Sequence, residues 1–172
     1  EGSNTWGHGS GCDSLTWRAG LGLHSTGWYG KENKTGNSFS YEFTLDKGTY
    51  TITTGHTEWW SAGRTTNVTA SYEGIAAPAE LGSASWSGSN GGITQNVTGS
   101  ITVPADQTKV TLTFTAGSAQ APVVSYIAIE KSSIANVFDD NLYMAVAAGK
   151  TPELPETVEA EMADGQITAK KV

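Results

Sequence analysis

Apolar and polar residues alternate along most of the chain. Between Ser38 and Leu45, for example, large apolar side chains occupy every second position and polar side chains occupy the others. A period of two places successive side chains on opposite faces of an extended strand, so this pattern predicts half-buried β-strands. We expect strands at residues 15–19, 38–45, 49–55, 65–72, 75–79, 93–103, 109–115 and 122–131.

Turn-forming residues separate these strands at intervals of about ten residues. Asp46-Lys47-Gly48 predicts a hairpin turn between the strands at 38–45 and 49–55. Many short strands joined by such turns are typical of an antiparallel β-sandwich. The sequence therefore predicts an all-β fold.

Two adjacent tryptophans, Trp59 and Trp60, lie in a predicted loop between two of these strands. Neighbouring residues of a strand face opposite sides, so a sheet could bury at most one of the two rings. An exposed indole ring suits the apolar face of a sugar, and His56, Glu58 and Arg64 are near enough in sequence to hydrogen-bond its hydroxyls. The alternative is that both rings cap one end of the core, because Trp is highly buried on average.

Other aromatic residues occur in connections that we expect at the same end of the sandwich. If antiparallel strands alternate in direction, the connections after the odd-numbered strands share one end. Those connections are residues 20–37, 55–64, 80–92 and 116–121. They contain Trp28, Tyr29, Trp59, Trp60 and Trp86, whereas the turns at the opposite end contain no aromatic residue. The sequence thus predicts an aromatic cluster at one end of the fold.

Composition restricts the classes of partner. The formal net charge is -7, and no basic stripe is available to neutralise phosphates, so nucleic acid and anionic membranes are excluded as partners. No run of about 18 apolar residues predicts a membrane span. The single cysteine, Cys12, excludes an intrachain disulfide. Together with abundant Gly, Ser and Thr, these features predict a secreted or cell-surface bacterial protein.

Catalysis is not predicted. Glu42 and Glu58 are the carboxylates nearest to aromatic residues, and the sequence gives neither a partner at the separation that glycosidases require. The three histidines lie in no HExxH or GxSxG context. We therefore expect a protein that is not an enzyme and has no catalytic residues.

The character of the chain changes after about residue 133. Residues 134–172 carry 7 acidic and 3 basic residues in a short stretch. A strand is expected at Tyr143 to Val146, and residues 157–163 and 166–172 predict a hairpin around Asp164-Gly165. About 39 residues are too few for an independent sandwich. We expect a β-sandwich module at 1–133, followed at 134–172 by a truncated domain or a small docked β-appendage.

Two segments resemble known families. Residues 38–50, Trp59-Trp60, Arg64, Asn67-Val68 and residues 122–129 resemble the galactose-binding-like β-sandwich modules of secreted bacterial glycosidases, especially the arabinofuranosidase-associated type. Residues 146–158, followed by Asp164-Gly165, resemble the opening half of bacterial Ig-like (group 4) repeats. The first resemblance implies a jelly-roll carbohydrate-binding module, in which a structural calcium ion is common. Both together imply covalently linked catalytic and Ig-like domains in a larger exported protein.

The resulting prediction is a non-catalytic carbohydrate-binding module that targets a multimodular glycoside hydrolase to plant or host glycans. The expected ligand-binding residues are Trp59, Trp60, Glu58, Arg64, His56, Trp28 and Tyr29. The metal ligands, if calcium binds, are not predicted. Two alternatives are a structural spacer packed on a catalytic domain and a surface adhesin module.

Overall fold

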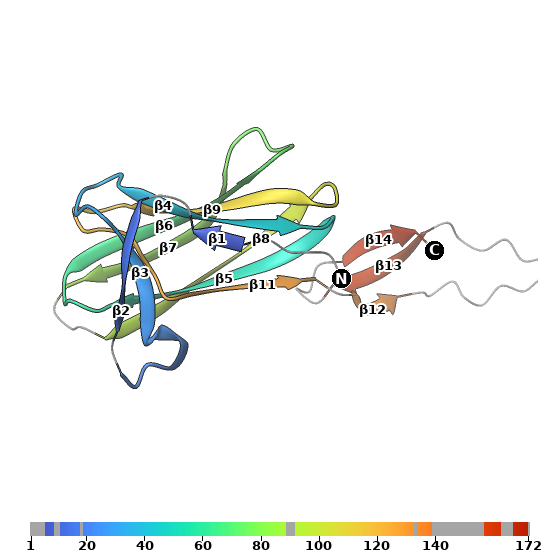
Figure 1. The fold of residues 1–172 in the computed structure, drawn as a ribbon. Helices are drawn as coiled ribbons and strands as arrows, with labels where there is room; N and C mark the ends of the chain where they lie inside the picture. Colours follow the sequence, from blue (N-terminus) through green and yellow to red (C-terminus); the bar gives the residue numbers. More distant parts are fainter. Residues whose placement is uncertain are drawn as a thin grey trace, which may run out of the picture. The chain divides into compact units, whose positions relative to one another are not determined.

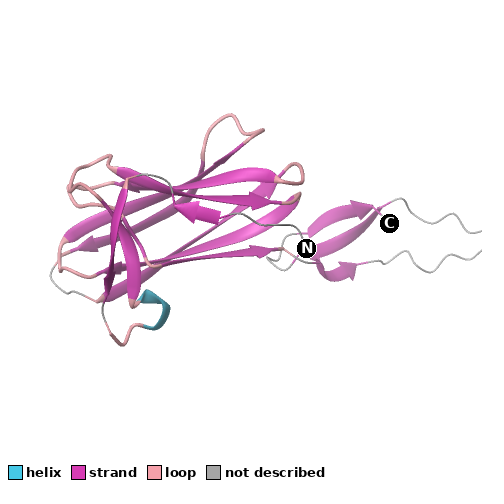
Figure 2. Ribbon diagram, viewed as in Figure 1, coloured by secondary structure: helices cyan, strands magenta, loops and turns pink. Residues whose placement is uncertain are grey.

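A computed structural model describes residues 6–8, 11–17, 19–88, 92–132, 134–138, 157–162 and 167–171. The chain divides into two compact units, Glu1–Glu130 (unit 1) and Lys131–Val172 (unit 2). In the described part of unit 1 all regular structure is β-strand, apart from one short 3-10 turn at Gly22–His24 (Figure 2). Every strand pairing with a described register is antiparallel. The predicted all-β antiparallel sandwich is confirmed.

Two sheets form the layers of the sandwich in unit 1 (Figure 1). The first has five strands in the order β1-β4-β9-β6-β7, and the second has three in the order β11-β5-β8. A third small sheet, β10-β3-β2, lies at one end of unit 1. The first sheet comprises β1 (Trp6–His8), β4 (Ser38–Leu45), β9 (Thr108–Ala116), β6 (Gly63–Tyr72) and β7 (Ala79–Ser87). The other two comprise β11 (Tyr126–Lys131), β5 (Gly48–Glu58) and β8 (Ile93–Val103), and β10 (Val123–Val124), β3 (Thr26–Gly30) and β2 (Cys12–Trp17).

The core lies between the two layers because each layer turns its apolar positions inward. Phe114 of β9 and Val68 of β6 are fully buried on one side, and Ile52 of β5 is fully buried on the other. Polar residues occupy the alternate positions, as the pattern in β9, TKVTLTFTA, illustrates. Burial of this alternating set explains why the strands at 38–45 and 93–103 have the predicted bounds.

The predicted hairpin between β4 and β5 is wrong. β4 pairs with β1 and β9, whereas β5 pairs with β8 in the opposite layer. The short connection between them passes from one layer to the other. Alternation tells which face of a strand is buried, but not which strand lies beside it.

Side-chain hydrogen bonds hold this connection in place. The Lys47 N–H donates to Asp106 Oδ1 at 2.9 Å, and the Gln107 side-chain amide donates to Asp46 Oδ1 at 2.8 Å. Both bonds join the β4–β5 connection to the β8–β9 turn, so the two turns support each other at this end of unit 1.

Three further boundaries differ from the prediction. The strand expected at 75–79 is instead β7 at Ala79–Ser87, inside a predicted loop. Its buried residues Leu81 and Ala84 break the period of two, because the register with β6 shifts beside Gly82, whose φ is +135°.

The predicted loop at 20–37 contains β3. β5 continues past Gly55 to Glu58, because Gly55 is a point of close approach to the Tyr126 ring and not a strand end.

Unit 2 contains a three-stranded sheet in the order β12-β13-β14. Its strands are β12 (Ile134–Phe138), β13 (Thr157–Met162) and β14 (Ile167–Lys171). β13 and β14 pair in antiparallel register, which confirms the predicted hairpin. The strand expected at Tyr143 to Val146 lies outside the described residues.

Candidate functional site

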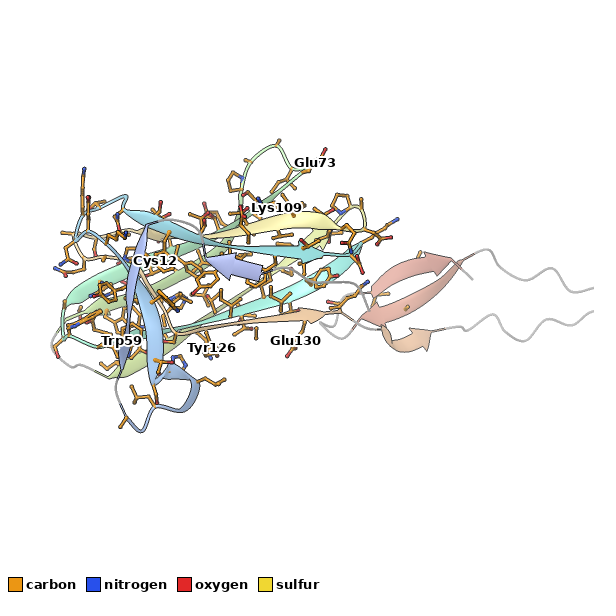
Figure 3. The ribbon with its side chains drawn as sticks, viewed as in Figure 1. Cys12, Trp59, Glu73, Lys109, Tyr126 and Glu130 are labelled. Atoms are coloured by element: carbon orange, nitrogen blue, oxygen red, sulfur yellow. The ribbon has the colours of Figure 1, made fainter. Side chains whose placement is uncertain are left out.

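The two tryptophans have different environments. Trp59 is 8% exposed and belongs to the core cluster, whereas Trp60 is 47% exposed. Trp59 packs against Gly27 of β3, where any Cβ would clash with the indole ring. Figure 3 shows Trp59 toward the end of unit 1 opposite Glu130. One ring therefore caps the core, and the other is presented to solvent, as the alternation argument requires.

Trp60 is held by neighbours from three segments. The Tyr29 ring of β3 lies 5.1 Å from it and the Trp59 ring lies 5.6 Å from it, both edge-on. The Arg64 guanidinium of β6 stands over the Trp60 ring, 5.1 Å from its centroid. A cation at this distance is attracted to the ring face. The exposed indole is thus fixed in orientation.

A buried ion pair supports the turn that carries Trp60. Glu58 Oε2 accepts a hydrogen bond from Arg64 Nε at 2.6 Å, and Glu58 Oε1 accepts one from the Trp60 backbone N–H at 2.8 Å. Arg64 Nη1 also donates to the Ala121 carbonyl. Ser61 follows with φ of +65°, a left-handed conformation that is uncommon for a residue other than glycine. The Glu58 carboxylate therefore stabilises both the turn and the Arg64 cation that contacts the Trp60 ring.

A pocket of about 310 Å³ opens beside the Trp60 ring. It is lined by Tyr29, Asn33, Trp60, Arg64, Gln120 and Ala121. Small-molecule sites start at about 300 Å³, so the space suits a ligand of a few rings at most. The side-chain amides of Asn33 and Gln120 each offer both donors and acceptors. The pocket combines an aromatic wall with neutral hydrogen-bonding groups.

The structure overturns the expected ligand contact of His56. The side chain is fully buried, Nδ1 lies 2.6 Å from the Val123 carbonyl oxygen, and Nε2 lies 2.8 Å from Thr54 Oγ1. A carbonyl only accepts, so Nδ1 carries the proton and Nε2 accepts from the threonine hydroxyl. Burial lowers the pKa of His56 from 6.5 to about 4, with a smaller lowering from His24 and an opposing effect of the Val123 bond. His56 is a neutral core residue.

Two other expected contacts also change. Glu58 is 1% exposed and its carboxylate oxygens face Trp60 and Arg64, so its role in this structure is support and not direct hydrogen bonding to a ligand. Trp28 is half-buried against the core and does not line the pocket, because it neighbours Tyr29 on β3 and faces the other side of the strand. Tyr29, Trp60 and Arg64 are brought together at the pocket.

Sequence reasoning missed Asn33 and Gln120 as pocket residues. Gln120 lies in the connection 116–121, which the alternation of strand directions had placed at the aromatic end. Gln120 could have been recognised from its side-chain amide, which can hydrogen-bond sugar hydroxyls, in a connection expected at the aromatic end. Trp86, by contrast, is a buried residue of β7 opposite Arg64, and it lines a second pocket of about 230 Å³ with Glu58 and Gln95.

The described residues include no group of three or more His, Cys, Asp or Glu side chains that could hold a metal ion. Glu42 forms an exposed ion pair with Lys109 at 2.8 Å. No helix among the described residues has the length and apolarity to cross a membrane.

Comparisons with known proteins identify similar folds. No family model matches the sequence, and no curated protein matches it. The structure is similar to the CBM22-1 and GH10 modules of endo-1,4-β-D-xylanase 10B from Clostridium thermocellum, complexed with xylohexaose, at 14% identity and a TM-score of 0.51. The match covers 73% of this chain and 26% of that chain, so this chain spans about a quarter of the xylanase structure.

Smaller proteins show the same similarity. A family 35 carbohydrate-binding module from Clostridium thermocellum has 16% identity and a TM-score of 0.48, over 74% of this chain and 98% of that one. Another family 35 module, from an environmental isolate, has 17% identity and a TM-score of 0.46, over 73% and 91%. Identities this low concern the fold alone. The chain has an antiparallel β-sandwich fold similar to that of carbohydrate-binding modules.

Proposed function

We propose that unit 1 is a non-catalytic carbohydrate-binding module whose site is the pocket beside Trp60. The observation that carries this proposal is a half-exposed indole ring, fixed by Tyr29 and Arg64, at the wall of a small amide-lined pocket. The C–H face of a sugar stacks on such a ring, while its hydroxyls exchange hydrogen bonds with amides. A rigid platform also reduces the entropy lost on binding.

Binding at this site is expected to be weak for a single sugar. Each hydroxyl exchanges hydrogen bonds with water for hydrogen bonds with protein, so the net gain per bond is small. We propose that unit 1 acts within a larger secreted bacterial protein, joined to Ig-like and catalytic domains, where several weak contacts combine by avidity. The sequence resemblances of residues 38–129 and 146–165 support this arrangement.

The first prediction concerns Trp60. A glycan array should identify the sugars that bind the chain, and titration calorimetry should then compare wild type with Trp60→Ala. Because a central Trp commonly contributes about 2 kcal/mol or more at a binding site, we expect affinity to fall at least about tenfold. Leu23→Ala is the matched control, since Leu23 is 72% exposed and lies outside the pocket.

Two results would contradict the proposal. A blank array would favour a spacer, in which a neighbouring domain covers Trp60. Equal affinities of Trp60→Ala and wild type for the same glycan would place the binding surface elsewhere, as in an adhesin that uses another face.

A further inference from the structure

The charge inside the pocket is almost fully compensated. Arg64 is the only formally charged residue among the described pocket-lining residues. Its side chain is 2% exposed, and Nε lies 2.6 Å from a Glu58 carboxylate oxygen that is itself buried. The pair as a whole has no net charge, so Arg64 is not an uncompensated cation.

Two of the five N–H donors of Arg64 have partners among the described residues. Nε donates to Glu58 and Nη1 donates to the Ala121 carbonyl. Nη2 has no hydrogen-bond partner within the described ranges, so it remains as a donor for a ligand oxygen. Nε, which would act together with Nη2 in bidentate binding of a carboxylate, already donates to Glu58. One hydroxyl or ring oxygen fits this donor.

The remaining polar groups of the pocket are neutral amides. Asn33 Oδ1 accepts from the Ala121 N–H at 3.0 Å, which orients its NH₂ group as the available donor. Gln120 is half-buried with no side-chain hydrogen bond among the described residues. Lys31, Glu32 and Lys34 flank Asn33 in the chain, but they are exposed and do not line the pocket. Solvent and salt screen such charges.

We propose that the pocket selects a neutral sugar residue over its uronic acid counterpart, and that Glu58 sets this preference by neutralising Arg64. The inference rests on the proposed function. A uronate would bring its carboxylate into a pocket whose one cation, Arg64, is already paired with Glu58, and the carboxylate would lose its hydration without an unpaired cation to offset that loss. A neutral sugar makes the same stacking contact without that cost.

Matched sugar pairs test the proposal. The methyl glycoside of galactose is compared with that of galacturonic acid, and the methyl glycoside of glucose with that of glucuronic acid, each with a free carboxylate; all are titrated at pH 7 while the Trp60 indole signal is followed by NMR. We expect the neutral member of a binding pair to bind at least about fivefold more tightly. Its affinity should change less than about twofold between about 20 and 500 mM salt, because no net charge is involved.

Two variants change the charge of the pocket. Glu58→Gln leaves the Arg64 charge uncompensated, and we expect the preference to move toward the uronate. Because breaking a buried ion pair is destabilising, Gln120→Lys provides a second route that leaves the pair intact. It should increase uronate affinity and introduce salt dependence, while Gln120→Met, of similar length and no charge, should not.

The outcomes separate this inference from the proposed function. Tighter binding of uronates by wild type, or an array positive only for acidic glycans, would overturn the inference and leave carbohydrate binding intact. No effect of Gln120→Lys on the uronate would also overturn it. A blank array would reject the proposed function, and this inference with it.

Discussion

At the scale of single residues, burial changes the role of the groups around the pocket. Glu58 and Arg64 are polar residues beside an exposed indole, yet they are 1% and 2% exposed. Breaking such a buried pair leaves an uncompensated charge, whereas the intact pair fixes geometry. The intact pair therefore orients Trp60 and carries no net charge.

His56 makes folding stability depend on pH. Its pKa of about 4 in the folded protein lies below the ordinary value of 6.5, so the unfolded chain takes up the proton first as the pH falls. The stabilisation is complete above pH 6.5 and is lost between pH 6.5 and 4. With about 1.4 kcal/mol per pKa unit, the loss approaches about 3 kcal/mol.

Urea unfolding of wild type and His56→Gln at pH 7 and pH 4.5 measures this effect. Carboxylates titrate in both proteins, so the difference between their pH dependences isolates His56. The variant should lose less stability on acidification. Equal losses in the two proteins would show that His56 is not held neutral in the fold.

At the scale of elements, β3 connects the small end sheet to the site. Gly27 lies between the Trp59 ring and the Val124 carbonyl oxygen of β10, and neither leaves room for a Cβ. Tyr29, two residues later on the same strand, contacts Trp60. The position of β3 thus controls both the packing of Trp59 and one wall of the pocket.

Gly27→Ala should therefore destabilise unit 1 and weaken sugar binding together. Overpacking of this kind typically costs about 1–3 kcal/mol, measurable by thermal or urea unfolding. Gly63→Ala is the control, because the nearest atom to a Cβ there is 3.7 Å away. Similar stability of the two variants would mean that β3 moves aside at no cost.

At the scale of the whole molecule, the residues that line the pocket all belong to unit 1. A chain ending at residue 132 should therefore keep the affinity of the full chain for its sugar within about twofold, since no free energy of binding comes from unit 2. Calorimetry on the two chains, with circular dichroism to verify folding, makes the comparison. A large loss of affinity in a folded truncated chain would assign part of the site to residues 133–172.

The sequence by itself determined the β-strand class and several strands. Alternation in 38–45 and 93–103 gave their bounds, because burial of one face requires a period of two wherever a sheet covers a core. It also predicted that at most one of Trp59 and Trp60 is buried within a sheet, with burial of both rings at the end of the core as the alternative. The expectation that the connection at 116–121 lies at the same end as the aromatic connections came from the alternating direction of the strands alone.

Only the tertiary structure decided the rest. Strand partners, including the separation of β4 and β5 into different layers, depend on contacts between distant residues that a local pattern does not contain. The burial of His56 and Glu58 likewise depends on distant segments that pack against them: the Val123 carbonyl bonds His56, and Arg64 of β6 bonds Glu58. Local alternation fixes which side of a strand is apolar, whereas long-range packing fixes what lies against it.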